Sequence, residues 1–244
     1  MDPRDRLIVA LDMPSLADAE GLADGLRGVV RWFKIGSHLF TTAGPDAVAA
    51  IARRGRVFLD TKFHDIPSVV GAAVGAAARQ GIALCTVHAS GGTAMMRAAW
   101  EAASAEAAVG GERLRVIGVT LLTSADAQTL AETGVGGSPA DAVVRLARLA
   151  QAAGLDGAVT SPLEVEAVRT ACGREFLLVC PGIRPLGGRE DDQRRVRAAG
   201  AAVAAGADML VVGRPITRAS DPRRVAEEIL CEIGEAAANV QLPN

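Results

Sequence analysis

The sequence contains no tyrosine among its 244 residues, and aromatic residues of all kinds make up only 3% of it. Proteins that hold single-stranded nucleic acid stack the bases on aromatic side chains, and a phosphate backbone calls for a basic excess. The formal net charge is −2 at pH 7, and neither half of the chain carries a run of Lys and Arg. A nucleic-acid partner is therefore not expected.

Cysteine is scarce too. The chain has Cys85, Cys172, Cys180 and Cys231, and no two of them form a CxxC pair. A disulfide framework or a zinc site would need ligands at closer and more regular spacing. Three of the four lie in apolar stretches, where a free Cys behaves as a small core residue. We expect buried thiols in a reducing cytoplasm, and no metal.

Long apolar runs are also absent. The first apolar run, LIVAL, ends at Asp12, which is too short for the apolar core and cleavage site of a secretory signal. No other stretch approaches the ~20 apolar residues that cross a bilayer. The sequence predicts a cytoplasmic protein with no membrane partner.

The chain is rich in short hydrophobic runs and in glycine. Half of its residues are hydrophobic, 22% are charged and 27 are Gly, which is typical of a large buried core with many tight turns. Eight short apolar or β-branched runs predict strands at residues 7–12, 31–36, 57–63, 84–89, 115–122, 157–160, 176–183 and 209–216. Eight Ala-rich segments predict helices at residues 15–26, 45–54, 67–80, 93–106, 140–153, 162–171, 191–205 and 222–238.

This eightfold alternation of strand and helix predicts an α/β fold, a (β/α)8 TIM barrel that forms a single domain over residues 1–244. Strands that are apolar at nearly every position fit a parallel sheet covered by helices. A doubly wound open sheet also alternates strand and helix, but its GxGxxG fingerprint is missing after the first strand, which runs into LDMPS. The barrel is therefore the favoured architecture.

Active sites of such barrels lie at the carboxyl ends of the strands. Polar residues close nearly every predicted strand. They are Asp12, Lys34, Asp60, Lys62, His88, Thr123, Thr160, Ser161, Arg184, Gly213 and Arg214. The sequence predicts that many of these side chains meet at one end of the barrel.

The segment DTKFHD carries the strongest chemical signal. Charges inside apolar strands are costly unless they are paired, and Asp60 and Lys62, two residues apart, should face the same side of a strand. With Lys34 and Asp65 they would form an alternating row of ammonium and carboxylate groups. Carboxylates beside Lys62 favour its charged form, which is suited to donate a proton. The alternative is an ion-pair network that only holds the barrel end together.

A phosphate site is predicted at the end of the eighth strand, where barrels often bind phosphate through backbone N–H groups. The motif VVGRPIT places Gly213 and Arg214 there, and the Arg guanidinium matches a phosphate group. Arg184 and Gln193 flank a Gly-rich segment and would close on the same anion. A solvated Gly-Arg turn is the alternative interpretation.

Two connections, residues 123–139 and 184–192, are long, polar and Gly-rich, which predicts mobile loops over the site. Two histidines, His64 and His88, lie near the same strand ends. Neither histidine has other metal-ligating residues at a suitable spacing in the sequence. We interpret both as hydrogen-bonded scaffold residues.

Seven motifs occur in order over nearly the whole chain: VALDMP, FKIGSHLF, DTKFHDIP, VHASGG, GVTLLTS, CPGIRP and VVGRPIT. Together they resemble the bacterial type of orotidine 5′-monophosphate decarboxylase, and DxKxxDIP is the most specific of them. The resemblance implies decarboxylation of orotidine 5′-monophosphate to uridine 5′-monophosphate, the last step of de novo pyrimidine synthesis, without cofactor or metal.

The resemblance also implies a role for each candidate residue. It makes Lys62 the proton donor to C6 of the pyrimidine and sets Asp60 against the departing carboxylate. Lys34 and Asp12 would hold the ribose, Thr123 would face the base, Arg184, Gln193, Gly213 and Arg214 would grip the phosphate, and Asp65 and Ile66 would reach the neighbouring subunit's site. The last assignment implies a homodimer with shared active sites.

The chain departs from the family pattern after DIP, where Ser68 and Val69 replace the usual Asn-Thr and remove an expected hydroxyl contact. Two rival functions stand beside the main one. A magnesium-dependent sugar-phosphate decarboxylase or synthase shares DxKxxD but carries Glu on the second strand, where this chain has Lys34, which would repel the ion. A non-catalytic nucleotide sensor would need no proton donor.

Overall fold

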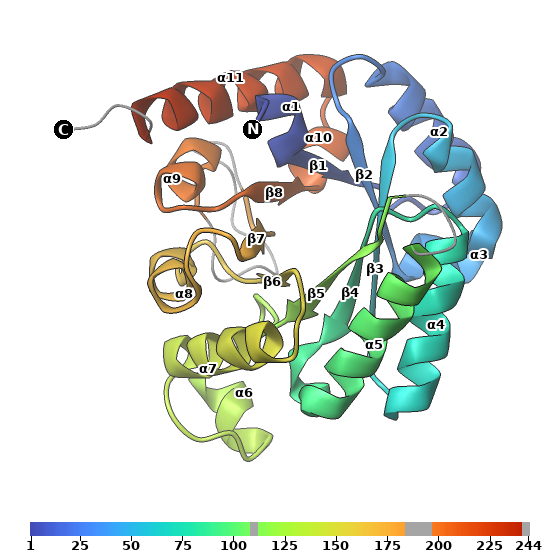
Figure 1. Ribbon diagram of the computed structural model, residues 1–244. Coiled ribbons are helices and arrows are strands. Elements are labelled where there is room, and N and C mark those ends of the chain that lie inside the picture. Colours follow the sequence, from blue (N-terminus) through green and yellow to red (C-terminus); the bar gives the residue numbers. More distant parts are fainter. Residues whose placement is uncertain (108–111, 184–196, 241–244) are drawn as a thin grey trace.

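The structure is a computed structural model that describes residues 1–107, 112–183 and 197–240. Eight parallel strands in these residues close into a barrel in chain order, ringed by helices (Figure 1). The strands are β1 (Leu7–Ala10), β2 (Trp32–Gly36), β3 (Arg56–Phe63), β4 (Leu84–His88), β5 (Arg115–Val119), β6 (Gly157–Val159), β7 (Leu177–Cys180) and β8 (Met209–Val212). The predicted (β/α)8 barrel is confirmed.

Helices lie between and around these strands in the described residues. They are α1 (Pro3–Arg6), α2 (Leu16–Gly25), α3 (Ser37–Ala52), α4 (Pro67–Arg79), α5 (Gly92–Ala107), α6 (Ala127–Glu132), α7 (Pro139–Ala152), α8 (Val165–Cys172), α9 (Ala199–Ala204), α10 (Arg214–Thr217) and α11 (Pro222–Val240), with a 3-10 turn η1 (Ala89–Gly91). The Ser15 hydroxyl accepts the backbone N–H of Asp18 and caps α2. The Ser138 hydroxyl accepts the backbone N–H of Asp141 and caps α7,.

Apolar side chains fill two layers. The outward-facing strand residues pack against the helices, and the inward-facing ones fill the barrel itself. The inner layer is made of Ile8, Ala10, Trp32, Phe58, Leu84, Ile117, Leu177, Val179, Met209 and Val211. Because both faces of each strand are buried, the strands are apolar without alternation. Polar residues concentrate at the carboxyl ends of the strands, which we call the mouth.

Several boundaries differ from the predicted ones, and three of the differences have a local cause. Helix α3 begins at Ser37 rather than residue 45, because Gly44, at φ 57° and ψ −143°, kinks it just before Pro45 instead of preceding its start. The connection 123–139, predicted as a loop, contains α6, whose six residues are too few to show helical periodicity,. Strand β8 ends at Val212, and the segment predicted to extend it forms the short helix α10.

All four cysteines are free thiols. Cys85, Cys172 and Cys180 are buried, and burial raises the pKa of the thiols of Cys85 and Cys180. They are therefore core side chains rather than nucleophiles. No helix within the described residues combines the length and the apolar character needed to cross a membrane.

Candidate active site

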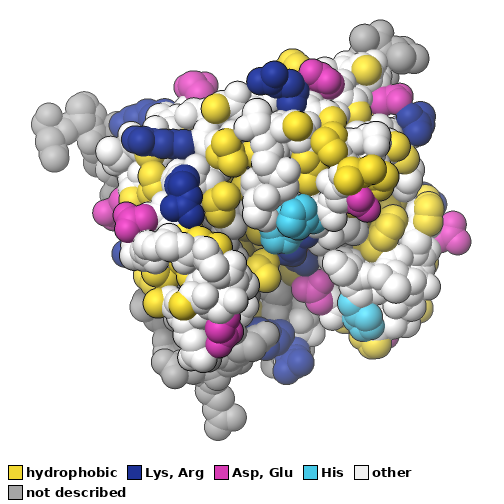
Figure 2. All heavy atoms as spheres, turned by 90° about the horizontal axis from the view of Figure 1, so that it is seen from below, with side chains coloured by type: hydrophobic (Ala, Val, Ile, Leu, Met, Phe, Trp, Pro, Cys, Tyr) yellow, Lys and Arg dark blue, Asp and Glu magenta, His cyan; other side chains and the backbone are white. Residues whose placement is uncertain are grey.

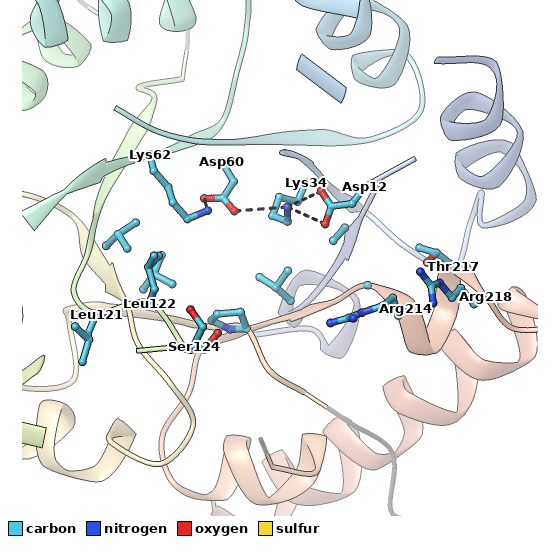
Figure 3. Close-up of a pocket in the computed structure, with 17 residues that line it drawn as sticks. Asp12, Lys34, Asp60, Lys62, Leu121, Leu122, Ser124, Arg214, Thr217 and Arg218 are labelled. Atoms are coloured by element: carbon cyan, nitrogen blue, oxygen red, sulfur yellow. Dashed lines mark hydrogen bonds and ion pairs between the residues drawn. The ribbon is translucent and has the colours of Figure 1, made fainter. Parts of the chain in front are cut away.

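A cavity of about 520 Å³ opens at the mouth of the barrel (Figure 3). Its wall is built from the ends of most strands and from the segments that follow them: Ala10, Asp12, Lys34, Asp60, Lys62, Val119, Leu121, Leu122, Thr123, Ser124, Val159, Pro181, Val211, Gly213, Arg214, Thr217 and Arg218. One side is charged, another is apolar, and a third is basic. A small molecule with a charged end and a flat apolar part fits such a lining.

The charged wall is a row of four side chains from the first three strand ends (Figure 3). Lys34 Nζ lies 3.1 Å from Asp12 Oδ1 and 3.5 Å from Asp60 Oδ2. Lys62 Nζ lies 2.9 Å from Asp60 Oδ1. Asp60 therefore holds one ammonium on each of its two oxygens, and the predicted pairing of Lys34, Asp60 and Lys62 is present.

Asp60 is the most strongly perturbed acid of this row. Burial by itself raises the pKa of its carboxyl group, but the charges of Lys34 and Lys62, together with hydrogen bonds from Lys62 and Thr86, outweigh burial. The net effect holds the pKa of Asp60 below its usual range, so the side chain is a carboxylate at neutral pH. Its side chain is 13% exposed, whereas that of Lys62 is 33% exposed and faces the cavity.

Lys62 is held in an unusual backbone conformation. Its φ is 54°, the single positive value of a non-Gly residue in the described part of the chain. Strain of this kind costs about 1–3 kcal/mol and is typical of functional sites. The pairing of β3 with β4 shifts here, since β3 advances from Leu59 to Phe63 while β4 advances only from Cys85 to Val87. This bulge aims the Lys62 side chain into the cavity.

Gly36, at the end of β2, leaves the space that the row needs. A Cβ atom at this position would lie 2.5 Å from Asp12 Oδ1 and 2.9 Å from Lys34 Nζ. Both contacts are shorter than any side chain tolerates, so a larger residue would displace the pair. The sequence motif FKIG contains this glycine, but its role becomes visible only when the three residues are placed in space.

The basic wall lies opposite Lys62 (Figure 3). Gly213 precedes α10, Arg214 is its first residue, and Arg218 is the residue that follows its last, Thr217, so that all four line the cavity. The sequence predicted Gly213 and Arg214 at the site but missed Arg218. That spacing of four signals a shared face only once the segment is known to be helical rather than extended.

Comparison with known proteins agrees with this geometry. Residues 5–229 match the sequence profile of the Orotidine 5′-phosphate decarboxylase / HUMPS family. The protein named orotidine 5′-phosphate decarboxylase from Halorhodospira halophila is 50% identical over 232 residues, which cover 95% of this chain and 97% of that protein. Its namesake from Trichlorobacter lovleyi is 47% identical over 233 residues, covering 95% and 96%. The chain belongs to this family.

A solved relative extends the similarity to three dimensions. The crystal structure of orotidine 5′-phosphate decarboxylase from Lactobacillus acidophilus matches this chain with a TM-score of 0.83 and 36% identity. The match covers 94% of this chain and 99% of that one. The family fold therefore accounts for the whole described barrel.

Lys34 occupies the position where a metal-dependent relative would need an acidic ligand. Its ammonium lies between the carboxylates of Asp12 and Asp60, where a divalent cation would need oxygen ligands and no competing positive charge. Among the described residues, no group of three or more His, Cys, Asp or Glu side chains is arranged to hold a metal ion. The site is thus built around ammonium groups.

Lysine occurs in this decarboxylase-family chain only at these two positions. Lys34 and Lys62 are its only lysines, and all the other basic residues among the 26 are arginines. Arginine serves as a permanent charge, whereas lysine can release a proton. The restriction of lysine to the charge row is a signal that a residue count could have given from the sequence.

Other predicted site residues lie outside the cavity wall. Asp65 is exposed and accepts the backbone N–H of Ile66, whose side chain is 62% exposed. Asp65 therefore does not extend the row within one chain. Ser68 and Val69 are exposed next to them. Arg184 and Gln193 lie outside the described residues.

The remaining polar residues at the mouth have structural contacts. Thr160 and Ser161 are buried at the end of β6, and the Ser161 hydroxyl accepts the backbone N–H of Leu163. The rings of His64 and His88 pack with their centroids 5.2 Å apart. Burial, followed by the nearby His64 and Lys62, lowers the pKa of His88. Figure 2 shows histidine, basic and acidic side chains close together near the centre of one face, with hydrophobic side chains beside them.

Proposed function

We propose that this protein decarboxylates orotidine 5′-monophosphate to uridine 5′-monophosphate and CO₂, with the whole chain as one barrel domain. The observation that carries the proposal is the row Lys34–Asp60–Lys62 along one wall of the mouth cavity. It provides a carboxylate and a proton donor side by side. The family relationship supports the same reaction.

The phosphate group binds at the basic wall, with Gly213 and Arg214 on α10 as its ligands. The family resemblance assigns Arg184 and Gln193, which lie outside the described residues, to the same phosphate group. Asp12 and Lys34 hold the ribose hydroxyls, and Thr123 faces the base from the apolar side. Binding energy gained at the phosphate then fixes the pyrimidine against the charge row.

Decarboxylation begins with the substrate carboxylate next to Asp60. Two like charges ~4 Å apart repel each other by ~4 kcal/mol at an effective dielectric constant of 20, and this repulsion disappears when CO₂ leaves. The bond between C6 and the carboxylate carbon breaks, and its electron pair stays on C6. The ammonium of Lys62 stabilises this carbanion and transfers a proton to C6, and water then reprotonates the amine.

The reaction so described uses only side chains of the protein and needs no cofactor or metal ion. A magnesium-dependent reaction on a sugar phosphate is the alternative within the family. The position of Lys34 between two carboxylates favours the decarboxylase. Activity that survives EDTA supports this choice, and activity that disappears with EDTA contradicts it.

A homodimer completes the site in this proposal. Asp65 and Ile66 are exposed just beyond the end of β3, and in this proposal they enter the cavity of a second copy and extend its charge row past Lys62. We further propose that the enzyme works in the cytoplasm, since its buried free thiols suit a reducing compartment,.

The proposed function is tested by following the ultraviolet absorbance of orotidine 5′-monophosphate after the protein is added. The wild type should change this absorbance, and variants at Lys62 should not. We expect Lys62→Ala to bind uridine 5′-monophosphate but to lose decarboxylation by at least ~10³-fold, because it removes the proton donor. Lys62→Arg is the matched control for charge. It keeps a cation but cannot release a proton at neutral pH, so it should be equally inactive. Full activity in either variant would refute the mechanism, and an inactive wild type would refute the function.

A further inference from the structure

We propose that Thr86 is a positioning residue for the reaction, because its hydroxyl group fixes both the backbone of Lys62 and the carboxylate of Asp60. This inference rests on the proposed function for its kinetic consequence. Its geometric content does not depend on the substrate.

Thr86 lies on β4, on the inward side of the strand above Leu84 of the barrel layer, and it is fully buried. Its Oγ1 accepts the backbone N–H of Lys62 at 2.9 Å. The same Oγ1 donates its proton to Asp60 Oδ1 at 3.1 Å. A single hydroxyl therefore uses one lone pair and its one proton on the two neighbouring residues of the charge row.

The bulge in β3 explains why a side chain is needed at this place. Residues 60–62 lie between the paired positions Leu59 and Phe63, opposite Thr86 on β4, so the regular ladder provides no backbone acceptor there. A buried N–H group without an acceptor costs as much as a lost hydrogen bond. The Thr86 hydroxyl takes the place of the missing carbonyl. It thereby stabilises the positive φ of Lys62.

The same hydroxyl orients Asp60. The carboxylate receives Lys62 Nζ and Thr86 Oγ1 on Oδ1, and Lys34 Nζ on Oδ2. Contacts on both oxygens leave it no freedom to rotate. Without the hydroxyl, the carboxylate and the Lys62 backbone both lose a fixed neighbour, and the proton donor moves relative to the substrate carbon.

Thr86→Val tests this inference, since valine keeps the shape of the side chain and removes the hydroxyl. We expect kcat to fall by about 10²-fold, the loss that a misplacement near 1 Å produces, while KM and the affinity for uridine 5′-monophosphate change little. The separate variant Thr86→Ser keeps a hydroxyl group and should therefore keep a kcat close to that of the wild type. In a crystal structure of Thr86→Val, the φ of Lys62 should leave the positive region, or its Nζ should move away from Asp60 Oδ1.

Thr120 provides the matched control. It is also buried, and its hydroxyl donates to the backbone carbonyl of Val159 at 2.8 Å, away from the charge row. Thr120→Val should lower the thermal midpoint about as much as Thr86→Val but leave kcat unchanged. Equal kcat in the two variants would overturn the inference.

If Thr86→Val does not fold, Thr86→Cys takes its place, because a thiol is a weaker donor and acceptor of similar size. An intermediate loss of kcat is then expected, and wild-type kcat would count against the inference. An inactive wild-type protein would instead refute the proposed reaction. The geometry of Lys62 in the crystal structure would still decide the role of Thr86.

Discussion

Two opposed effects act on the pKa of the Asp60 side chain. Burial favours its neutral form, and two ammonium groups favour its carboxylate form. The ammonium groups prevail, so its pKa in the folded state lies below the value of about 3.9 in an unfolded chain. As the pH falls, the unfolded chain therefore binds a proton before the folded chain does, and the stabilisation by Asp60 is complete only where the group is charged in both states.

The predicted consequence is a stability contribution that is complete above about pH 4 and is lost as the pH falls through the lower folded-state pKa. At neutral pH, Asp60→Asn should lower the free energy of unfolding by about 3 kcal/mol, because it removes the buried carboxylate that both ammonium groups share, leaving Lys34 with Asp12 alone and Lys62 without its ion pair,. The free energy of unfolding can be measured with urea at a series of pH values from about 6 downward. The difference in this free energy between wild type and Asp60→Asn should narrow below about pH 4.

Asp46→Asn is the control for that series. Asp46 is exposed on α3 and makes no ion pair with any of the described residues. Its substitution should shift the free energy of unfolding little at any pH. If the difference in free energy of unfolding between wild type and Asp60→Asn stayed constant below about pH 4, it would contradict the assigned direction of the pKa shift.

Helix α10 carries the proposed phosphate site. Arg214 begins this helix and Arg218 follows its last residue, and both line the cavity. We expect Arg214→Ala to weaken binding of uridine 5′-monophosphate by about 10²-fold, in line with a charged hydrogen bond of 1.5–3 kcal/mol, and Arg218→Ala, whose residue is exposed, to weaken it less,.

Isothermal titration with uridine 5′-monophosphate and with uridine separates the phosphate contribution from that of the base. The affinity for uridine should be equal in wild type and in both variants, because uridine has no group for the arginines to bind. A loss of uridine affinity that matches the loss for the nucleotide would show that these residues shape the cavity rather than bind the phosphate.

The elements also show what can be derived from the sequence. Apolar strands and helix-starting residues such as Pro67 and Pro222 are local signals, and they predicted the order of strands and helices in the barrel. Lys34, Asp60 and Lys62 could be placed together because they end neighbouring strands. The roles of Gly36, Thr86 and Arg218 could not be derived, since each depends on a distance across elements or on a change from strand to helix.

The assembly of two chains is the prediction that belongs to the whole molecule. If Asp65 of one chain completes the cavity of another, two inactive variants can restore each other. We expect Lys62→Ala and Asp65→Asn to be inactive or strongly impaired alone. Mixed dimers contain one cavity with both native residues, and unbiased mixing should recover about a quarter of the wild-type activity.

The mixing experiment is read by the same absorbance assay after the two variants have been unfolded and refolded together. Lys62→Ala mixed with Asp60→Asn is the control, because both changes affect residues of the same chain's charge row and every mixed dimer keeps one defect in each cavity. Recovery in the control, or none in the test mixture, would contradict shared active sites.

The packed interior of the barrel has a consequence for the path of the reactants. Trp32 and Phe58 are buried in the inner layer beneath the charge row, so the described barrel is a closed cup rather than a tube. The substrate enters, and CO₂ and the nucleotide leave, through the same opening at the mouth. The rate of turnover then depends on the order in which the two products are released.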